Sequence, residues 1–139
     1  MAHERLPPDD PREWLNRARS NLARAKAGAV VPEVYLEDPC FDAQQAAEKA
    51  VKAVLIHRDI PFPYIHDLAE LLRLVESGGE SVSDRVKQAG RLTRFAFATR
   101  YPGPVAPVSL EEYERAVAIA ETVLRWAEEC IGKRPQESG

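Results

Sequence analysis

The sequence predicts an all-α fold, an antiparallel bundle of four to five helices, from two features of the chain. Apolar residues recur every three or four positions along most of the 139 residues, which is typical of amphipathic helices. No stretch alternates apolar and polar residues as a half-buried strand does. With 45% hydrophobic and 29% charged residues, the chain fits one globular domain. We expect this domain at residues 11–132, between tails at 1–10 and 133–139.

The first helix is expected to start at Pro11, because proline suits the first helical position and Asp9 or Asp10 can cap it. Gly28 ends the pattern. The expected buried stripe is Trp14, Leu15, Ala18, Leu22 and Ala25. Five basic residues and one acid lie between Arg12 and Lys26, so the exposed surface of this helix is predicted to be basic.

The second helix, from Phe41 to Arg58, is predicted to be the central one. Its apolar face is broad and consists mostly of alanine, which lets neighbouring helices approach closely on at least two sides. Glu48 and Lys52 are four residues apart on the opposite face, and we expect them to form a pair on the solvent side. The Pro61-Phe62-Pro63 turn stops the helix.

The third helix is expected to open at His66 and Asp67 and to close at Ser77-Gly78-Gly79. Its predicted buried stripe is Leu68, Leu71, Leu72 and Val75. A fourth helix is predicted from near Ser83 to about Arg100. Its predicted inward arc is Val86, Ala89, Leu92, Thr93 and Ala96, with Phe95 outside it.

The fifth helix has the most complete start and stop signals. Ser109 and Glu112 form a capping box at its start, and apolar residues repeat at helical spacing from Tyr113 until Gly132.

The chain lacks the signals of several protein classes. The net charge of -3 excludes a uniformly basic nucleic-acid binder. No apolar run is long enough to span a membrane and no signal segment is visible, so a cytoplasmic location is expected. Cys40 and Cys130 are far apart, and no metal-ligand or cofactor-binding motif is found, so neither a metal nor a cofactor is predicted.

Basic residues of the fourth helix are the first candidates for a binding site. Lys87, Arg91 and Arg94 fall on one arc, which could hold phosphate groups beside an aromatic ring. Arg100 and Tyr101 follow at the end of that helix, and His66 opens the third helix. Each has a structural alternative, because charged faces are commonly solvated, a cation suits a helix C-terminus, and a histidine can cap a helix.

Three blocks of the sequence resemble the HEPN domain family. They are Phe41-Asp42-Ala43-Gln44-Gln45-Ala46-Ala47-Glu48-Lys49-Ala50-Val51-Lys52-Ala53-Val54-Leu55, then His66-Asp67-Leu68, then Thr99-Arg100-Tyr101-Pro102-Gly103. The resemblance implies a helical bundle that commonly forms a homodimer. It also implies binding of a nucleotide or RNA, often beside a minimal nucleotidyltransferase in a toxin–antitoxin-like or substrate-binding pair.

Many HEPN proteins are metal-independent ribonucleases with a histidine four to six residues after an arginine. That pattern is missing here, because no histidine follows His66. The resemblance therefore favours a non-catalytic nucleotide- or RNA-binding module, with phosphate contacts at Arg94, Arg100 and Tyr101. Two alternatives remain open: a divergent ribonuclease that uses Arg100 and His66, and a structural helical dimer without a ligand.

Overall fold

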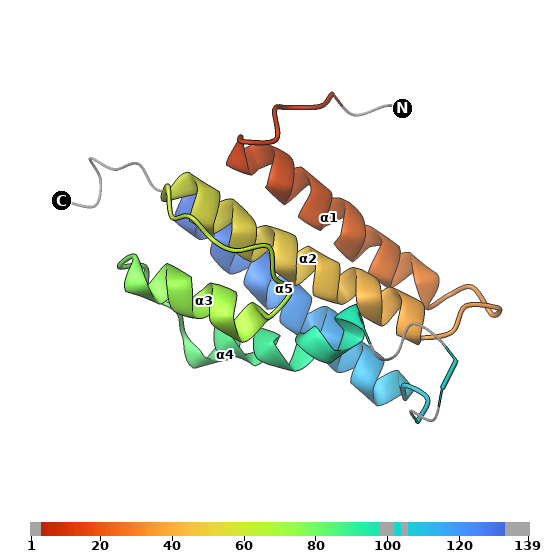
Figure 1. Ribbon diagram of the computed structural model, residues 1–139. Helices are drawn as coiled ribbons and strands as arrows, with labels where there is room; N and C mark the ends of the chain where they lie inside the picture. Colours follow the sequence, from red (N-terminus) through yellow and green to blue (C-terminus); the bar gives the residue numbers. More distant parts are fainter. Residues whose placement is uncertain (1–3, 98–101, 104–105, 133–139) are drawn as a thin grey trace.

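A computed structural model of the chain describes residues 4–97, 102–103 and 106–132 (Figure 1). These residues form α1 (Pro11–Gly28), α2 (Glu37–His57), α3 (Leu68–Ser77), α4 (Asp84–Lys87), the 3₁₀ helix η1 (Gln88–Ala96) and α5 (Leu110–Gly132). No strand occurs among them, so the predicted all-α class is confirmed. In this part of the chain, no helix is both long and apolar enough to cross a bilayer.

Helix α2 is the centre of the bundle, as predicted. It contacts α1, α3, η1 and α5, and Figure 1 shows it between α1 and α3 with α5 behind it. Its alanines are completely buried, which explains how neighbours on several sides approach it closely. These alanines are Ala43, Ala46, Ala47, Ala50 and Ala53. The helix begins at Glu37, four residues before the predicted Phe41, and accommodates Pro39 in its first turn.

Side-chain caps start α1, α3 and α5, two of them as predicted, whereas at α3 the cap is Asp67 and not His66. Asp10 accepts a hydrogen bond from the backbone N–H of Arg12 at the start of α1, and Asp67 caps α3 in the same way. At α5 the Ser109 hydroxyl accepts from the backbone N–H of Glu112, while the Glu112 carboxylate accepts from that of Ser109. These bonds satisfy backbone donors that a helix start leaves without partners.

The prediction of one long fourth helix was wrong. Residues 84–87 are α-helical, but the chain then continues as the 3₁₀ helix η1, which has three residues per turn. Val86, Ala89, Leu92 and Phe95 follow that spacing and are all buried. Phe95, predicted to lie off the inward stripe, is 4% exposed, whereas Thr93 is only partly buried. The apolar period of three therefore favours the tighter helix, and Gly90 weakens the alternative α-helix.

Helices α1 and α5 run antiparallel. Arg19 of α1 pairs with Glu128 of α5 at 2.6 Å. About two helical turns further along α1, Lys26 pairs with Glu121, which lies earlier in α5, at 3.2 Å. The buried Tyr113 hydroxyl donates to the backbone oxygen of Ala25 at 2.7 Å. The acidic α5 therefore neutralises one side of the basic α1, and the other side of α1 is left for contacts with α2 and solvent.

Candidate functional site

The side of α2 predicted to face solvent is buried. Glu48 is 4% exposed and Lys52 is 3% exposed, so the prediction of an exposed pair was wrong. The cause is the segment 58–67 between α2 and α3, which crosses over this side of α2 (Figure 1). It brings Phe62, Tyr64 and His66 against the helix, with Lys52 Nζ 5.8 Å from the centre of the Phe62 ring. A charged pair has thereby become part of the interior.

The Glu48 carboxylate accepts hydrogen bonds from three side chains. Its Oε1 accepts from Gln44 Nε2 at 2.7 Å and lies 2.9 Å from Nδ1 of His66. Its Oε2 accepts from Lys52 Nζ at 2.9 Å. Because an ionised carboxylate can only accept, the hydrogen of the His66 contact must be on Nδ1. In the neutral imidazole, Nε2 then carries a lone pair.

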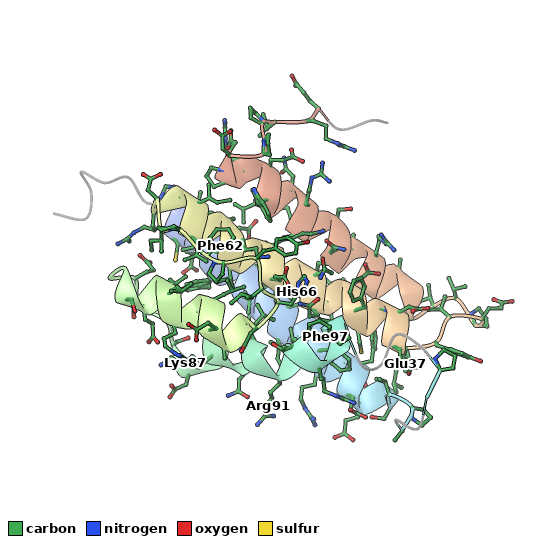
Figure 2. All side chains as sticks on the ribbon, viewed as in Figure 1. Glu37, Phe62, His66, Lys87, Arg91 and Phe97 are labelled. Atoms are coloured by element: carbon green, nitrogen blue, oxygen red, sulfur yellow. The ribbon has the colours of Figure 1, made fainter. Side chains whose placement is uncertain are left out.

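Aromatic rings flank His66 on two sides. The Tyr64 and Phe97 rings each lie 5.7 Å from the imidazole, in edge-to-face arrangements. Tyr64 is 89% exposed and Phe97 is 59% exposed, although large aromatic side chains are usually buried. Figure 2 shows Phe62, His66 and Phe97 following the course of α2. We call Gln44, Glu48, Lys52, Tyr64, His66 and Phe97 the His66 site.

The charge of the His66 site depends on the imidazole. Glu48 and Lys52 neutralise each other across their 2.9 Å contact, so a neutral His66 leaves the site without net charge. A protonated His66 makes it positive, and both ring nitrogens then donate hydrogen bonds. The His66 side chain is 32% exposed, whereas that of Glu48 is 5% exposed, so a ligand can reach the imidazole but not the carboxylate.

The basic residues predicted on the fourth helix do not form one cluster. Arg91 and Arg94 line the same hollow of about 170 Å³, where Arg94 pairs with Glu112 at 2.9 Å. Lys87 does not line this hollow and pairs with Glu76 of α3 at 3.1 Å. Figure 2 shows Lys87 and Arg91 along α4 and η1, away from His66. Phosphate binding at Lys87, Arg91 and Arg94 stays a prediction.

Arg100 and Tyr101 lie outside the described residues. The described chain stops at Phe97 and resumes at Pro102, so the last described residue before them contacts His66. Their predicted role in phosphate binding therefore stays a prediction.

Sequence reasoning missed five members of the site, which are Gln44, Glu48, Lys52, Tyr64 and Phe97. A glutamate and a lysine four residues apart have the same spacing in an exposed pair and in a buried one. The signal available in the sequence was the segment Pro61-Phe62-Pro63-Tyr64. Its aromatic rings indicate that the segment packs against a neighbouring helix.

Among the described residues, neither Cys40 nor a group of metal-ligating side chains adds a second candidate for chemistry. Cys40 is completely buried, and burial raises the pKa of its thiol to about 12, so it is not a nucleophile near neutral pH. No group of three or more His, Cys, Asp or Glu side chains within residues 4–97, 102–103 and 106–132 is arranged to hold a metal ion.

Comparisons with known proteins agree with this architecture. The family model of the HEPN domain matches residues 11–130. The crystal structure of TT1696 from Thermus thermophilus is 31% identical, with a TM-score of 0.76 over 88% of this chain and 98% of that one. The structure of ST0689, described as an archaeal HEPN homologue, is 25% identical, with a TM-score of 0.72 over 93% and 99% of the two chains. No curated protein is similar enough to count as a match.

Proposed function

Because the chain belongs to the HEPN domain family, we propose that it is a nucleotide- or RNA-binding module whose ligand occupies the His66 site. The observation that carries this proposal is the 2.9 Å contact between Glu48 and His66 beside two exposed aromatic rings. A buried carboxylate fixes the orientation of an accessible imidazole, and the rings offer surfaces for a base.

The chemistry of the site suits a nucleotide. Protonated His66 donates from Nε2 to a phosphate oxygen, while Tyr64 or Phe97 stacks on the base. Arg100 and Tyr101 follow Phe97 by three and four residues, so they are close enough along the chain to add phosphate contacts. The sequence blocks that resemble the HEPN family also converge here, since Glu48 belongs to the first block and His66 to the second.

Titration calorimetry with adenosine and uridine 5′-monophosphates tests this proposal. We expect His66→Ala to weaken binding at least tenfold, because it removes the phosphate donor. His57→Ala is the matched control, since it removes a second, partly exposed histidine from the end of α2. If both variants bound the nucleotide with the affinity of the wild type, the ligand would lie elsewhere. A melting temperature unchanged by either nucleotide would favour a structural helical dimer, because a ligand selective for the folded state stabilises it.

A homodimer and a minimal nucleotidyltransferase partner belong to the same proposal. The support for a dimer is the apolar exposed surface at Tyr64 and Phe97, which a second copy or a partner could cover. Light scattering on the purified chain measures the dimer directly. Affinity purification from the native host, followed by mass spectrometry, tests the nucleotidyltransferase. A monomer with no such companion would contradict this part of the proposal.

A metal-independent ribonuclease is the second candidate, and the tautomer of His66 favours it. With Nδ1 donating to Glu48, the neutral ring can accept the proton of an RNA 2′-hydroxyl at Nε2. The 2′-oxygen then attacks the adjacent phosphorus, and the bond to the 5′-oxygen breaks to give a 2′,3′-cyclic phosphate. The leaving 5′-oxygen takes up a proton from solvent, and the protonated ring returns its own proton to solvent. Cleavage of RNA in excess chelator that is lost in His66→Ala would support this function, whereas intact RNA after long incubation would remove it.

A further inference from the structure

A cavity lies beside the row of α2 residues next to that of Glu48, between α2, α1 and the segment before α1. We call it the α1 groove. It has a volume of about 640 Å³, and its lining includes the five cations Arg5, Arg17, Arg19, Arg24 and Lys49 and the carboxylates Glu4 and Glu13. Two further carboxylates lie behind the lining, where Glu128 pairs with Arg19 and Asp42 with Arg24, so cations exceed carboxylates by one. The chain as a whole has a net charge of -3, so this surface is a local exception to the overall charge. A concave surface with an excess of one charge attracts ligands of the opposite charge.

Buried carboxylates orient two of these arginines. Glu13, which is 5% exposed, accepts from Arg17 Nε at 2.8 Å and from the backbone N–H of Leu6 at 3.0 Å. Asp42, which is 7% exposed, lies 3.6 Å from Arg24 Nε. In both cases the Nε side of the guanidinium faces the protein. The two terminal nitrogens of each arginine therefore remain for a ligand, with the side chains 58% and 73% exposed.

Lys49 is held between these arginines by an amide. Its Nζ donates to Asn21 Oδ1 at 2.7 Å, and Asn21 Nδ2 donates to Asp42 Oδ1 at 3.1 Å. Burial, together with the charge of Arg17, lowers the pKa of Lys49. An anion in the groove would favour the charged form of Lys49 and so raise this lowered pKa.

An aromatic pocket adjoins the α1 groove. It has a volume of about 340 Å³, is lined by Leu6, Pro8 and Trp14, and shares Glu13, Arg17 and Lys49 with the groove. The Trp14 indole donates to the backbone oxygen of Pro8 at 2.7 Å, which fixes the ring. A fixed aromatic ring beside cations is the combination that binds unpaired bases and their phosphates.

We propose that the α1 groove and the Trp14 pocket form a second site, which binds a single-stranded polynucleotide. This inference rests on the proposed function and extends it, because the same strand would occupy the His66 site. Arg17 and Arg24 are seven residues apart on α1, about 10.5 Å along the helix axis, which is too far for one phosphate to bridge. The two sites lie on adjacent rows of α2, since Lys49 lines the groove and Glu48 holds His66.

The test compares a long ligand with a short one. Fluorescence anisotropy measures binding of a labelled 12-nucleotide uridine RNA and of the DNA strand of equal length, and calorimetry measures uridine 5′-monophosphate. The variant is Arg17→Gln/Arg24→Gln. The control is Arg12→Gln/Arg73→Gln, which removes the same charge from arginines that pair with Asp10 and Glu70 outside the groove.

We expect the groove variant to bind the 12-nucleotide strand at least tenfold more weakly than the control. The plot of log affinity against log salt concentration, whose slope is negative, should become less steep by about 1.4, from about 0.7 for each of the two lost phosphate contacts. Mononucleotide affinity should not change. RNA and DNA strands of similar affinity would mean that the backbone is read without the 2′-hydroxyl, and a preference for RNA would assign that group a contact. Both outcomes support the proposal.

Three results would overturn the proposal. The groove variant and the control could bind the strand with equal affinity, or the wild type could bind duplex RNA as tightly as the single strand. The third is displacement of the strand by poly-glutamate at equal charge concentration. The last would identify an acidic polypeptide as the ligand. If the groove variant does not fold, Lys49→Met replaces it, because that change removes a half-buried charge. Strand binding that is lost in the groove variant without any mononucleotide binding would reject the His66 site but keep the groove.

Discussion

Glu48 Oε1 lies 2.9 Å from Nδ1 of His66, although the two residues are separated by the end of α2 and a proline-containing turn. This contact joins the central helix to the segment that crosses it. It also defines which ring nitrogen of His66 is available to a ligand. The carboxylate acts as a positioning group, since Lys52 and Gln44 occupy its other bonds and solvent hardly reaches it.

Glu48→Gln is expected to destabilise the fold strongly. It leaves Lys52 as a buried cation without its ion-pair partner, and loss of one member of a buried pair costs about 3–5 kcal/mol. Urea unfolding followed by circular dichroism measures the change. The control is Glu129→Gln on the exposed side of α5, which should change the free energy of unfolding by less than about 0.5 kcal/mol.

A double variant separates the buried charge from the packing around it. Glu48→Leu/Lys52→Met removes both charges, so we expect it to be more stable than Glu48→Gln. If the double variant were instead the less stable of the two, the lost hydrogen bonds of residue 48 to Gln44 and His66, and not the unpaired charge of Lys52, would be the larger cost.

Tyr64→Ala is expected to weaken nucleotide binding without unfolding the protein. Removal of a stacked aromatic ring costs about 1–3 kcal/mol for each base, which corresponds to roughly 5- to 150-fold in affinity. Tyr35→Ala is the matched control, because Tyr35 is 77% exposed but precedes α2. Calorimetry with uridine 5′-monophosphate distinguishes them. The same affinity in the two variants would show that Tyr64 does not stack on the ligand.

Arg100→Ala is expected to weaken nucleotide binding and to leave the melting temperature nearly unchanged. The reason is that the sequence places this cation shortly after Phe97, which contacts His66. Arg100→Lys should restore only part of the affinity, since lysine lacks the planar fork of donors that matches a phosphate. Calorimetry and thermal melting of the two variants would be measured together. Unaltered binding in Arg100→Ala would exclude this residue from the site.

Glu112 at the start of α5 is expected to make the stability of the fold depend on pH. The backbone N–H of Ser109 lowers the pKa of Glu112, with a further contribution from Arg94. A carboxyl group whose pKa is lowered by folding stabilises the protein above its ordinary pKa, about 4.5, and this contribution is lost as the pH falls through the lowered value. The difference in melting temperature between the wild type and Glu112→Gln should therefore shrink between pH 6 and pH 3. A difference that stays constant over this range would contradict the assignment.

Local signals along the chain predicted most of the fold. Asp10 before Pro11 and Ser109 before Glu112 start helices where expected, because a cap involves only residues within one turn. The alanine face of α2 predicted a helix with several neighbours, since small side chains permit close packing. The three-residue spacing of Val86, Ala89, Leu92 and Phe95 is also visible in the sequence. The predicted helix there was nevertheless an α-helix, whose period is 3.6 residues.

Only the tertiary structure decided which charged residues lie together. The spacing of Glu48 and Lys52 is the same in an exposed pair and a buried one, and the crossing of residues 58–67 over α2 buried them. Likewise, Arg17, Arg24 and Lys49 share a groove because α1 packs beside α2. By contrast, Lys87 pairs with Glu76 and does not line the hollow that Arg91 lines, although both come from one basic stretch. Helical periodicity is a property of neighbours in sequence, but burial and charge clustering depend on which surfaces meet in space.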